Sequence, residues 1–301
     1  EAIHGNNMPK EIGVFLYEDL CNPNLDIFLS QGNRIAITGI IKDLTKFTNR
    51  GESVERSFIV KANNIEPLEE QYKEMRITDE EIREINELST NPKLKDLLVD
   101  SYCPDIYGNE IVKQGILLQL FGGRPIYQEG RKVCSGIIHI LLIGDPSEGK
   151  TTLSKYLKLL SPKYQYAVGK GSTGRGLTAY AVKDEILATW CLQAGSVVLA
   201  SGGICVVDEV DKMDKEEQQH LSECMSDQTV TISKAVKGTL KAETSILACA
   251  NFKGGRFDPF QNVFQQIDFP IWMINRLTLI FVLKDIIDEE FKKIKGEKKE
   301  E

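Results

Sequence analysis

IIHILLIGDPSEGKT, residues 137–151, joins an apolar run to a turn bounded by two glycines and then to the start of a helical stretch. Residues 144–151 fit the pattern G-x-x-x-x-G-K-[S/T] in full. A run of apolar residues without alternation is typical of a parallel strand covered on both faces. We therefore predict a buried strand over 137–143, a phosphate-binding loop, and a helix over 151–160.

The composition of this loop fits the binding of a nucleoside triphosphate. Glycines let backbone N–H groups close around phosphate oxygens, and the helix N-terminus adds partial positive charge. We expect Lys150 to reach the β- and γ-phosphates and the Thr151 hydroxyl to face Mg²⁺. Glu148 fits beside phosphate only if its carboxylate points outward. The nucleotide-binding residues expected here are Gly144, Asp145, Pro146, Ser147, Glu148, Gly149, Lys150, Thr151 and Thr152. The alternative is an ordinary surface turn.

Two later apolar runs also end in polar residues that suit this chemistry. Residues 204–207 lead into Asp208 and Glu209, and residues 245–250 lead into Asn251. We expect Asp208 to hold Mg²⁺ through water, Glu209 to polarise an attacking water, and Asn251 to orient that water, so ATP hydrolysis is implied. The ends of parallel strands share one sheet edge, where ligands bind. The alternatives are a helix cap for the acidic pair and a turn former for Asn251.

Arg276 lies just before the apolar run 279–283, which places it at the opposite edge from the phosphates. It is therefore expected to serve the nucleotide of a neighbouring subunit, as an arginine finger supplied in trans. Such an arrangement predicts a ring-shaped oligomer with sites between subunits. A structural ion pair is the alternative.

The overall composition sets broader limits. The chain has 301 residues, with 37 Lys and Arg against 44 Asp and Glu, so its formal net charge is −7. The 42% hydrophobic and 27% charged content excludes a mainly disordered chain. No apolar run is long enough for a membrane span, so no membrane partner is expected. Seven cysteines without a C-x-x-C pair and three histidines predict no zinc site.

The regions that flank the predicted loop differ in character. Residues 1–65 alternate in several short runs and predict a small β-barrel. Residues 66–87 are strongly acidic, and Thr78 with Glu81 predicts a capped helix start at a domain boundary. Residues 229–241 predict a hairpin that carries Lys234, Lys237 and Lys241. A ring of such tips would contact a DNA backbone without reading its sequence; a solvated hairpin edge is the alternative.

Several longer stretches resemble one known family. They are GDPSEGKT (144–151), GKGSTGRGLTAYAVKDE (169–185), GGICVVDEVDKM (202–213), TVTISKAVKGTLKAETSILACAN (229–251), GRFDP (255–259) and INRLTLIF (274–281). In this order they are similar to the minichromosome maintenance (MCM) replicative helicases of the AAA+ class.

The resemblance implies a multidomain α/β protein with a small all-β part. Residues 1–75 would be part of an OB-type domain, 76–94 an acidic helical linker, and 95–285 an AAA+ P-loop core whose parallel sheet has helices on both faces. Residues 286–301 would be a charged tail, without the family's helical lid.

The resemblance also implies roles for particular residues. Lys150 and Thr151 match Walker A, Asp208 and Glu209 Walker B, Asn251 sensor 1, and Arg276 the finger. Tyr107 would lie beside the adenine, and Lys234, with Lys237, would face DNA on the pre-sensor-1 hairpin.

The function implied is that of an ATP-dependent DNA helicase subunit, with ATP and Mg²⁺ as cofactors. It would act in a homo- or hetero-oligomeric ring, most simply a hexamer, around single-stranded or duplex DNA. It would be cytoplasmic in an archaeon and nuclear in a eukaryote. Three departures from the family pattern leave an alternative, a catalytically impaired paralogue that binds nucleotide or DNA in assembly. They are Asn275-Arg276-Leu277-Thr278 in place of the family's usual Ser-Arg-Phe-Asp, Phe252 in place of Pro, and Glu243 in place of Arg.

Overall fold

The computed structural model describes residues 12–21, 29, 33–48, 51–68, 77–146, 148–169, 174–183, 190–232, 237–258 and 260–283. The chain divides into two compact units, one formed by residues 1–83 with 183–189 and the other by 84–182 with 190–301. Each unit is described by itself.

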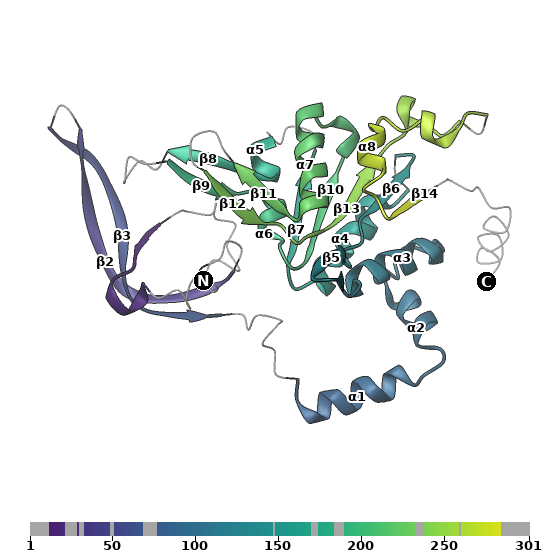
Figure 1. Ribbon diagram of the computed structural model, residues 1–301, viewed down its shortest axis with the longest axis horizontal. Coiled ribbons are helices and arrows are strands. Elements are labelled where there is room, and N and C mark those ends of the chain that lie inside the picture. Colours follow the sequence, from purple (N-terminus) through teal and green to yellow (C-terminus); the bar gives the residue numbers. More distant parts are fainter. Residues whose placement is uncertain are drawn as a thin grey trace, which may run out of the picture. The chain divides into compact units, whose positions relative to one another are not determined.

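The first unit contains a three-stranded sheet in the order β1-β3-β2 (Figure 1). The strands are β1 (Gly13–Phe15), β2 (Ile35–Thr48) and β3 (Gly51–Pro67), and the short 3-10 helix η1 (Glu18–Leu20) follows β1. The β2–β3 ladder is antiparallel and shifts register at Thr38/Gly39, where a Cβ on Gly39 would collide with the carbonyl oxygen of Lys61. A β-rich N-terminal region is therefore present, and its completion as an OB-type barrel stays a prediction.

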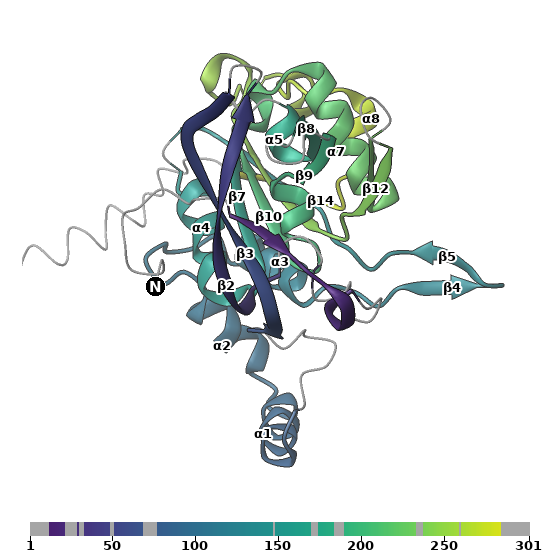
Figure 2. The same cartoon turned by 90° about the vertical axis from the view of Figure 1, so that its left-hand side faces the viewer.

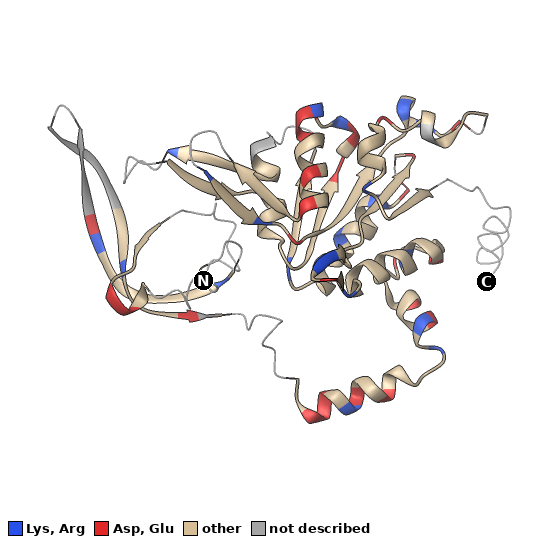
Figure 3. Cartoon of the chain, in the orientation of Figure 1, with Lys and Arg blue, Asp and Glu red and all other residues tan. Residues whose placement is uncertain are grey.

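The helix predicted to start at Thr78 in the acidic stretch is α1 (Asp79–Ser89). Its capping box forms as expected, because the Thr78 backbone N–H donates to Glu81 Oε2 at 2.8 Å and the Glu81 N–H donates to Thr78 Oγ1 at 3.3 Å. Figure 3 shows acidic residues along α1, and the carboxylates of its first turn interact favourably with the positive end of the helix dipole.

The second unit is built on a five-stranded sheet in the order β14-β6-β13-β10-β7, and every neighbouring pair is parallel. The strands are β6 (Ile140–Gly144), β7 (Tyr164–Val168), β10 (Ile204–Asp208), β13 (Ser245–Ala250) and β14 (Leu279–Leu283). This confirms the predicted α/β core with a parallel sheet. The strand expected over 137–143 begins instead at Ile140, and β7 was not predicted, because its sequence YQYAV lacks a continuous apolar run.

Helices cover both faces of the sheet. On one face lie α2 (Leu94–Ser101), α3 (Glu110–Phe121) and α4 (Lys150–Leu160), and on the other α5 (Gly174–Leu177), α6 (Ser196–Leu199), α7 (Lys215–Asp227) and α8 (Ile271–Ile274). Alternate β6 residues face opposite sides, so Leu142 packs with the α3–α4 side and Leu141 with the α7 side. Both side chains are fully buried, and each such burial contributes about 1.5–3 kcal/mol.

Three two-stranded hairpins extend from this core. They are β4 (Ile126–Gln128) with β5 (Arg131–Cys134), β8 (Ala179–Lys183) with β9 (Trp190–Ala194), and β11 (Thr229–Ile232) with β12 (Gly238–Lys241). Figure 2 shows β4 and β5 projecting away from the sheet. The 3-10 helices η2 (Val210–Lys212), η3 (Lys253–Gly255) and η4 (Val263–Gln265) lie in connections. Within the described residues, no helix has the length and apolar character that crossing a bilayer requires.

His139, immediately before β6, is a buried polar residue that ties the sheet together. Its Nδ1 accepts a hydrogen bond from the Ile246 backbone N–H at 3.2 Å, and its carbonyl oxygen accepts one from the Thr278 N–H at 2.8 Å. Burial lowers the pKa of His139 from its ordinary 6.5 to about 4, because a buried imidazolium loses its hydration.

We predict that His139 makes the second unit sensitive to acid. The fold favours the neutral imidazole, so this contribution is fully present above pH 6.5 and is lost as the pH falls from 6.5 towards about 4. The loss amounts to about 3 kcal/mol in the free energy of unfolding. Imidazole NMR titration should give a pKa near 4 in the folded chain and near 6.5 in concentrated urea. A folded-state pKa near 6.5 would contradict the prediction.

Candidate nucleotide-binding site

Three of the predicted site positions lie at the carboxyl edge of the parallel sheet. Gly144 ends β6, Asp208 ends β10, and Asn251 directly follows β13. The phosphate-binding loop begins at the same edge, since it continues from Gly144 to Lys150, the first residue of α4. The sheet therefore brings together the residues that the sequence predicted for one site.

Asp208 and Thr151 are in direct contact. The Thr151 hydroxyl donates to Asp208 Oδ2 at 3.1 Å, so the first turn of α4 is joined to the end of β10 across the intervening strand β13. The other carboxylate oxygen, Oδ1, accepts the backbone N–H of Glu209 at 2.9 Å. A hydroxyl and a carboxylate oxygen side by side are ligand types that Mg²⁺ accepts, so these two residues fit the expected metal site.

Lys150 lies inside the loop and is 7% exposed. Its ammonium donates to the carbonyl oxygens of Gly144 and Asp145, both at 2.6 Å. Burial lowers the pKa of Lys150, and nearby negative charges, Glu148 foremost, oppose that shift. The ammonium is thus held at the base of the loop by backbone carbonyls and has an acidic neighbour.

Glu148 differs from the sequence expectation, because its carboxylate points inward. Both carboxylate oxygens are buried, and a Cβ on Gly144 would collide with Glu148 Oε2. The carboxylate therefore packs against the end of β6, on the side of the loop where its charge acts on Lys150. The physical reason is that the buried Lys150 ammonium needs a nearby anion to offset its lost hydration.

The loop has two further supports that the sequence motifs did not indicate. Gly149 has a positive φ of 77°, and a Cβ there would come within 2.7 Å of Ile106 Cδ1, so Ile106 packs directly against the loop backbone. Asp145 accepts the Phe257 N–H on Oδ1 at 2.8 Å. Tyr107 follows Ile106 in the chain and is 76% exposed. Ser147 lies outside the described residues.

Glu209 and Asn251 are each engaged with a neighbour from the loop after β10. Glu209 has a left-handed φ of 53°, and its Oε1 accepts the Lys212 ammonium at 2.5 Å. The Asn251 backbone N–H donates to Asp211 Oδ1 at 3.2 Å. Burial raises the pKa of Asp211. Because Asp211 lies in the loop after β10 and accepts the N–H of the residue after β13, it connects the ends of these two strands. Sequence spacing alone did not indicate this link.

Phe252, one of the departures from the family pattern, has a structural explanation. It is 3% exposed and packs against Phe257, with the ring centroids 5.3 Å apart. An aromatic side chain at this position fills the core beside the site.

The structure places Arg276 away from these residues. It is exposed, between α8 and β14, and β14 begins at Leu279, which pairs with Ile140 at the start of β6. Gly144 lies four residues further along β6, about 13 Å away at the rise of a strand. Arg276 is thus at the opposite edge of the sheet from the loop. The two residues after it serve the fold, since Leu277 packs against the core and Thr278 Oγ1 accepts the His139 N–H at 3.2 Å.

The lysines expected on the hairpin are only partly described. Lys237 is exposed at the residue before β12, and Lys241 ends that strand. Lys234 lies outside the described residues. A Cβ on Gly238 would collide with Leu192 Cδ1, so β9 packs closely against the loop end of this hairpin, where Gly238 pairs with Ile232.

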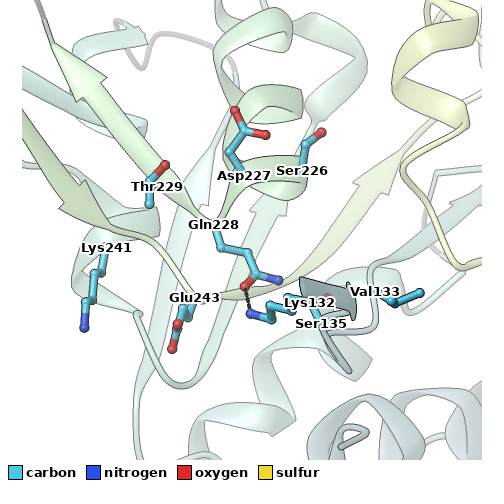
Figure 4. Close-up of a pocket in the computed structure, with 9 residues that line it drawn as sticks. All are labelled: Lys132, Val133, Ser135, Ser226, Asp227, Gln228, Thr229, Lys241 and Glu243. Atoms are coloured by element: carbon cyan, nitrogen blue, oxygen red, sulfur yellow. Dashed lines mark hydrogen bonds between the residues drawn. The ribbon is translucent and has the colours of Figure 1, made fainter. Parts of the chain in front are cut away.

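A hollow of about 390 Å³ lies elsewhere, near the C-terminal end of α7 (Figure 4). Its polar lining includes the Lys132 ammonium, which donates to Gln228 Oε1 at 2.6 Å. The residues around it are Lys132, Val133, Ser135, Ser226, Asp227, Gln228, Thr229, Lys241 and Glu243. No residue predicted for nucleotide or metal lines this hollow, so it is separate from the loop site.

Comparison with known proteins identifies relatives of this chain. The MCM P-loop domain family matches residues 81–295. The chain is 34% identical over 288 residues to the minichromosome maintenance protein MCM of Saccharolobus solfataricus, covering 95% of this chain and 41% of that protein. It is 34% identical over 290 residues to the DNA replication licensing factor MCM2 of Oryza sativa, covering 95% of this chain and 30% of that protein.

A third relative is the DNA replication licensing factor Mcm6 of Anopheles gambiae. It is 41% identical over 215 residues, which cover 71% of this chain and 26% of that protein. The chain therefore spans less than half the length of each of these relatives.

We predict that the Glu148→Gln variant binds nucleotide more tightly than the parent chain. The carboxylate attracts Lys150 and repels phosphate, so its replacement by a neutral amide of similar size should raise affinity for ADP about tenfold. Titration with a fluorescent ADP measures the change, and Glu216→Gln, an exposed position on α7, is the matched control. Equal or weaker binding by Glu148→Gln would contradict the prediction.

Proposed function

The chain belongs to the minichromosome maintenance (MCM) family, and we propose that it is a motor segment of an ATP-dependent DNA helicase subunit. The observation that carries this proposal is the contact between Thr151 and Asp208 beside the phosphate-binding loop. A P-loop threonine and a strand-end aspartate in contact are the pair needed for a triphosphate with its divalent cation.

In this proposal the loop holds ATP by its backbone and by Lys150. The ammonium leaves the carbonyl oxygens of Gly144 and Asp145 and turns to the β- and γ-phosphates, where its charge is better compensated. Thr151 would hold Mg²⁺ by its hydroxyl, and Asp208 would hold it through water. The cation, when bound, neutralises charge on the phosphates. Tyr107 is proposed to lie beside the adenine, since it is exposed next to the loop contact made by Ile106.

Hydrolysis is proposed to depend on Glu209 and Asn251. Glu209 accepts the proton of the attacking water, and to do so its carboxylate must release the Lys212 ammonium. Asn251 orients the same water through its side-chain amide. Because both residues sit just past the ends of β10 and β13, they flank the loop from the side where the γ-phosphate would lie.

Residues outside the nucleotide site are proposed to act in subunit assembly and in DNA binding. Arg276, exposed at the opposite sheet edge, is proposed to complete the site of an adjacent subunit in a ring, most simply a hexamer of like or related chains. Lys234 and Lys237 are proposed to contact DNA in the ring's channel. The N-terminal sheet is proposed to be part of an OB-type domain that binds single-stranded DNA. Such a subunit would act in the cytoplasm of an archaeon or in the nucleus of a eukaryote.

The alternative is a family member that binds nucleotide and supports assembly without turnover. The Glu209–Lys212 ion pair favours it, because the ammonium occupies the carboxylate oxygen Oε1, which would otherwise be open to an attacking water.

We predict that the chain hydrolyses ATP and that Glu209→Gln lowers turnover at least about a hundredfold, while nucleotide affinity changes little. Lys150→Ala should abolish nucleotide binding, because the main positive charge of the loop is removed. Phosphate release, measured with and without single-stranded DNA, and fluorescent-ATP binding test both statements, with Glu216→Gln as control. Nucleotide binding without turnover, in both the parent chain and Glu209→Gln, would support the assembly role instead.

We predict that Lys237→Ala weakens DNA binding by a similar factor for all sequences and reduces the slope of log affinity against log salt by about 1. The reason is that a backbone contact carries charge and no base information. Fluorescence anisotropy over a salt series measures this, with Lys158→Ala on the exposed side of α4 as the matched control. An unchanged salt slope in Lys237→Ala would count against the channel role of the hairpin.

A further inference from the structure

Tyr166 lies on β7, at the side of the site away from the phosphate-binding loop. β7 pairs with β10 in parallel, with Tyr166 opposite Val206, two residues before Asp208. The Tyr166 hydroxyl donates to Asp208 Oδ2 at 2.7 Å. This contact joins an edge strand of the sheet to the carboxylate proposed to hold the metal.

The hydrogen bond completes a set of donors around Asp208. Oδ2 accepts both Tyr166 and Thr151, and Oδ1 accepts the Glu209 N–H. These donors come from β7, from α4 and from the loop after β10, so they fix both the position and the plane of the carboxylate. Thr151 is itself a proposed metal ligand, whereas Tyr166 is free of that role and is left as a dedicated support.

Tyr166 is itself held in place. The Lys155 ammonium lies over its ring, 5.1 Å from the centroid, and Lys155 is four residues after Thr151 on α4. The pKa of Tyr166 is raised, first by burial and then by its hydrogen bond to Asp208. The Tyr166 ring and its hydroxyl are therefore both engaged, which fixes the donor beside Asp208.

We infer that Tyr166 is a positioning residue for the metal site, which holds the Asp208 carboxylate in the orientation that binds Mg²⁺. This inference rests on the proposed nucleotide function. Carboxylates that bind metals are commonly oriented by such a hydrogen bond, and the loss of the donor typically costs about tenfold or more in metal affinity or activity.

Tyr164 provides a matched comparison on the same strand. It is two residues before Tyr166, so both side chains are on the same face of β7. Its hydroxyl is buried and makes no hydrogen bond within the described residues, and burial raises its pKa to about 12. Tyr164→Phe therefore removes the same atom from the same face of β7 without removing a hydrogen bond to Asp208.

The test compares Tyr166→Phe, Tyr164→Phe and the parent chain. The probe is a fluorescent ADP, titrated without divalent cation and at a series of Mg²⁺ concentrations, so the readout is binding and not turnover. We expect Tyr166→Phe to need about tenfold more Mg²⁺ for the same gain in ADP affinity, with cation-free affinity unchanged. Tyr164→Phe should match the parent in both respects. Thermal unfolding without ligand checks that both variants remain folded.

The results that would overturn the positioning role can be told apart from those that would overturn the nucleotide function. The positioning role is wrong if the parent chain gains ADP affinity with Mg²⁺ and Tyr166→Phe gains it identically. It is also wrong if Tyr164→Phe is impaired as much as Tyr166→Phe. In both cases the proposed nucleotide site stands. If the parent chain binds ADP neither with nor without Mg²⁺, the proposed function fails and the positioning role fails with it.

Discussion

The hydrogen bond between Thr151 and Asp208 is the point on which the nucleotide site depends. It joins residues 57 positions apart in sequence and spans the intervening strand β13. The contact is possible because β6, β13 and β10 are parallel, so the loop after each strand leaves the sheet at the same edge. Burial of β6 and β10 on both faces fixes this register, since a one-residue shift would exchange the residues that face the two helical layers.

The charged side chains of the site have partners within the chain itself, without a nucleotide. The Lys150 ammonium donates to two carbonyl oxygens and has the inward Glu148 carboxylate as its foremost negative neighbour, and the Asp208 carboxylate accepts three hydrogen bonds. A buried charge is costly unless it is paired, so these contacts keep each group in place. The consequence for function is that phosphate must compete with Glu148 for Lys150, whereas a cation finds Asp208 already oriented.

Much of the core followed from sequence because its signals are local. The loop motif, the apolar runs and the Thr78 capping box are each readable within a few residues, and the parallel sheet confirmed what they predicted. What escaped prediction depends on tertiary contacts. Tyr166 and Ile106 belong to no spacing pattern, and only the pairing of β7 with β10 and the close approach to Gly149 reveal them. The inward direction of Glu148 likewise depends on a close approach to Gly144 at the end of β6, which no sequence pattern indicates.

The proposed nucleotide site is tested most directly by a structure of the chain with Mg²⁺ and a non-hydrolysable ATP analogue. It predicts that the phosphates lie against the backbone of the loop before α4, with Lys150 turned towards them. The metal should be flanked by the Thr151 hydroxyl and the Asp208 carboxylate, and Tyr166 should still donate to Asp208. An analogue bound elsewhere, or a metal that Thr151 and Asp208 do not flank, would contradict it.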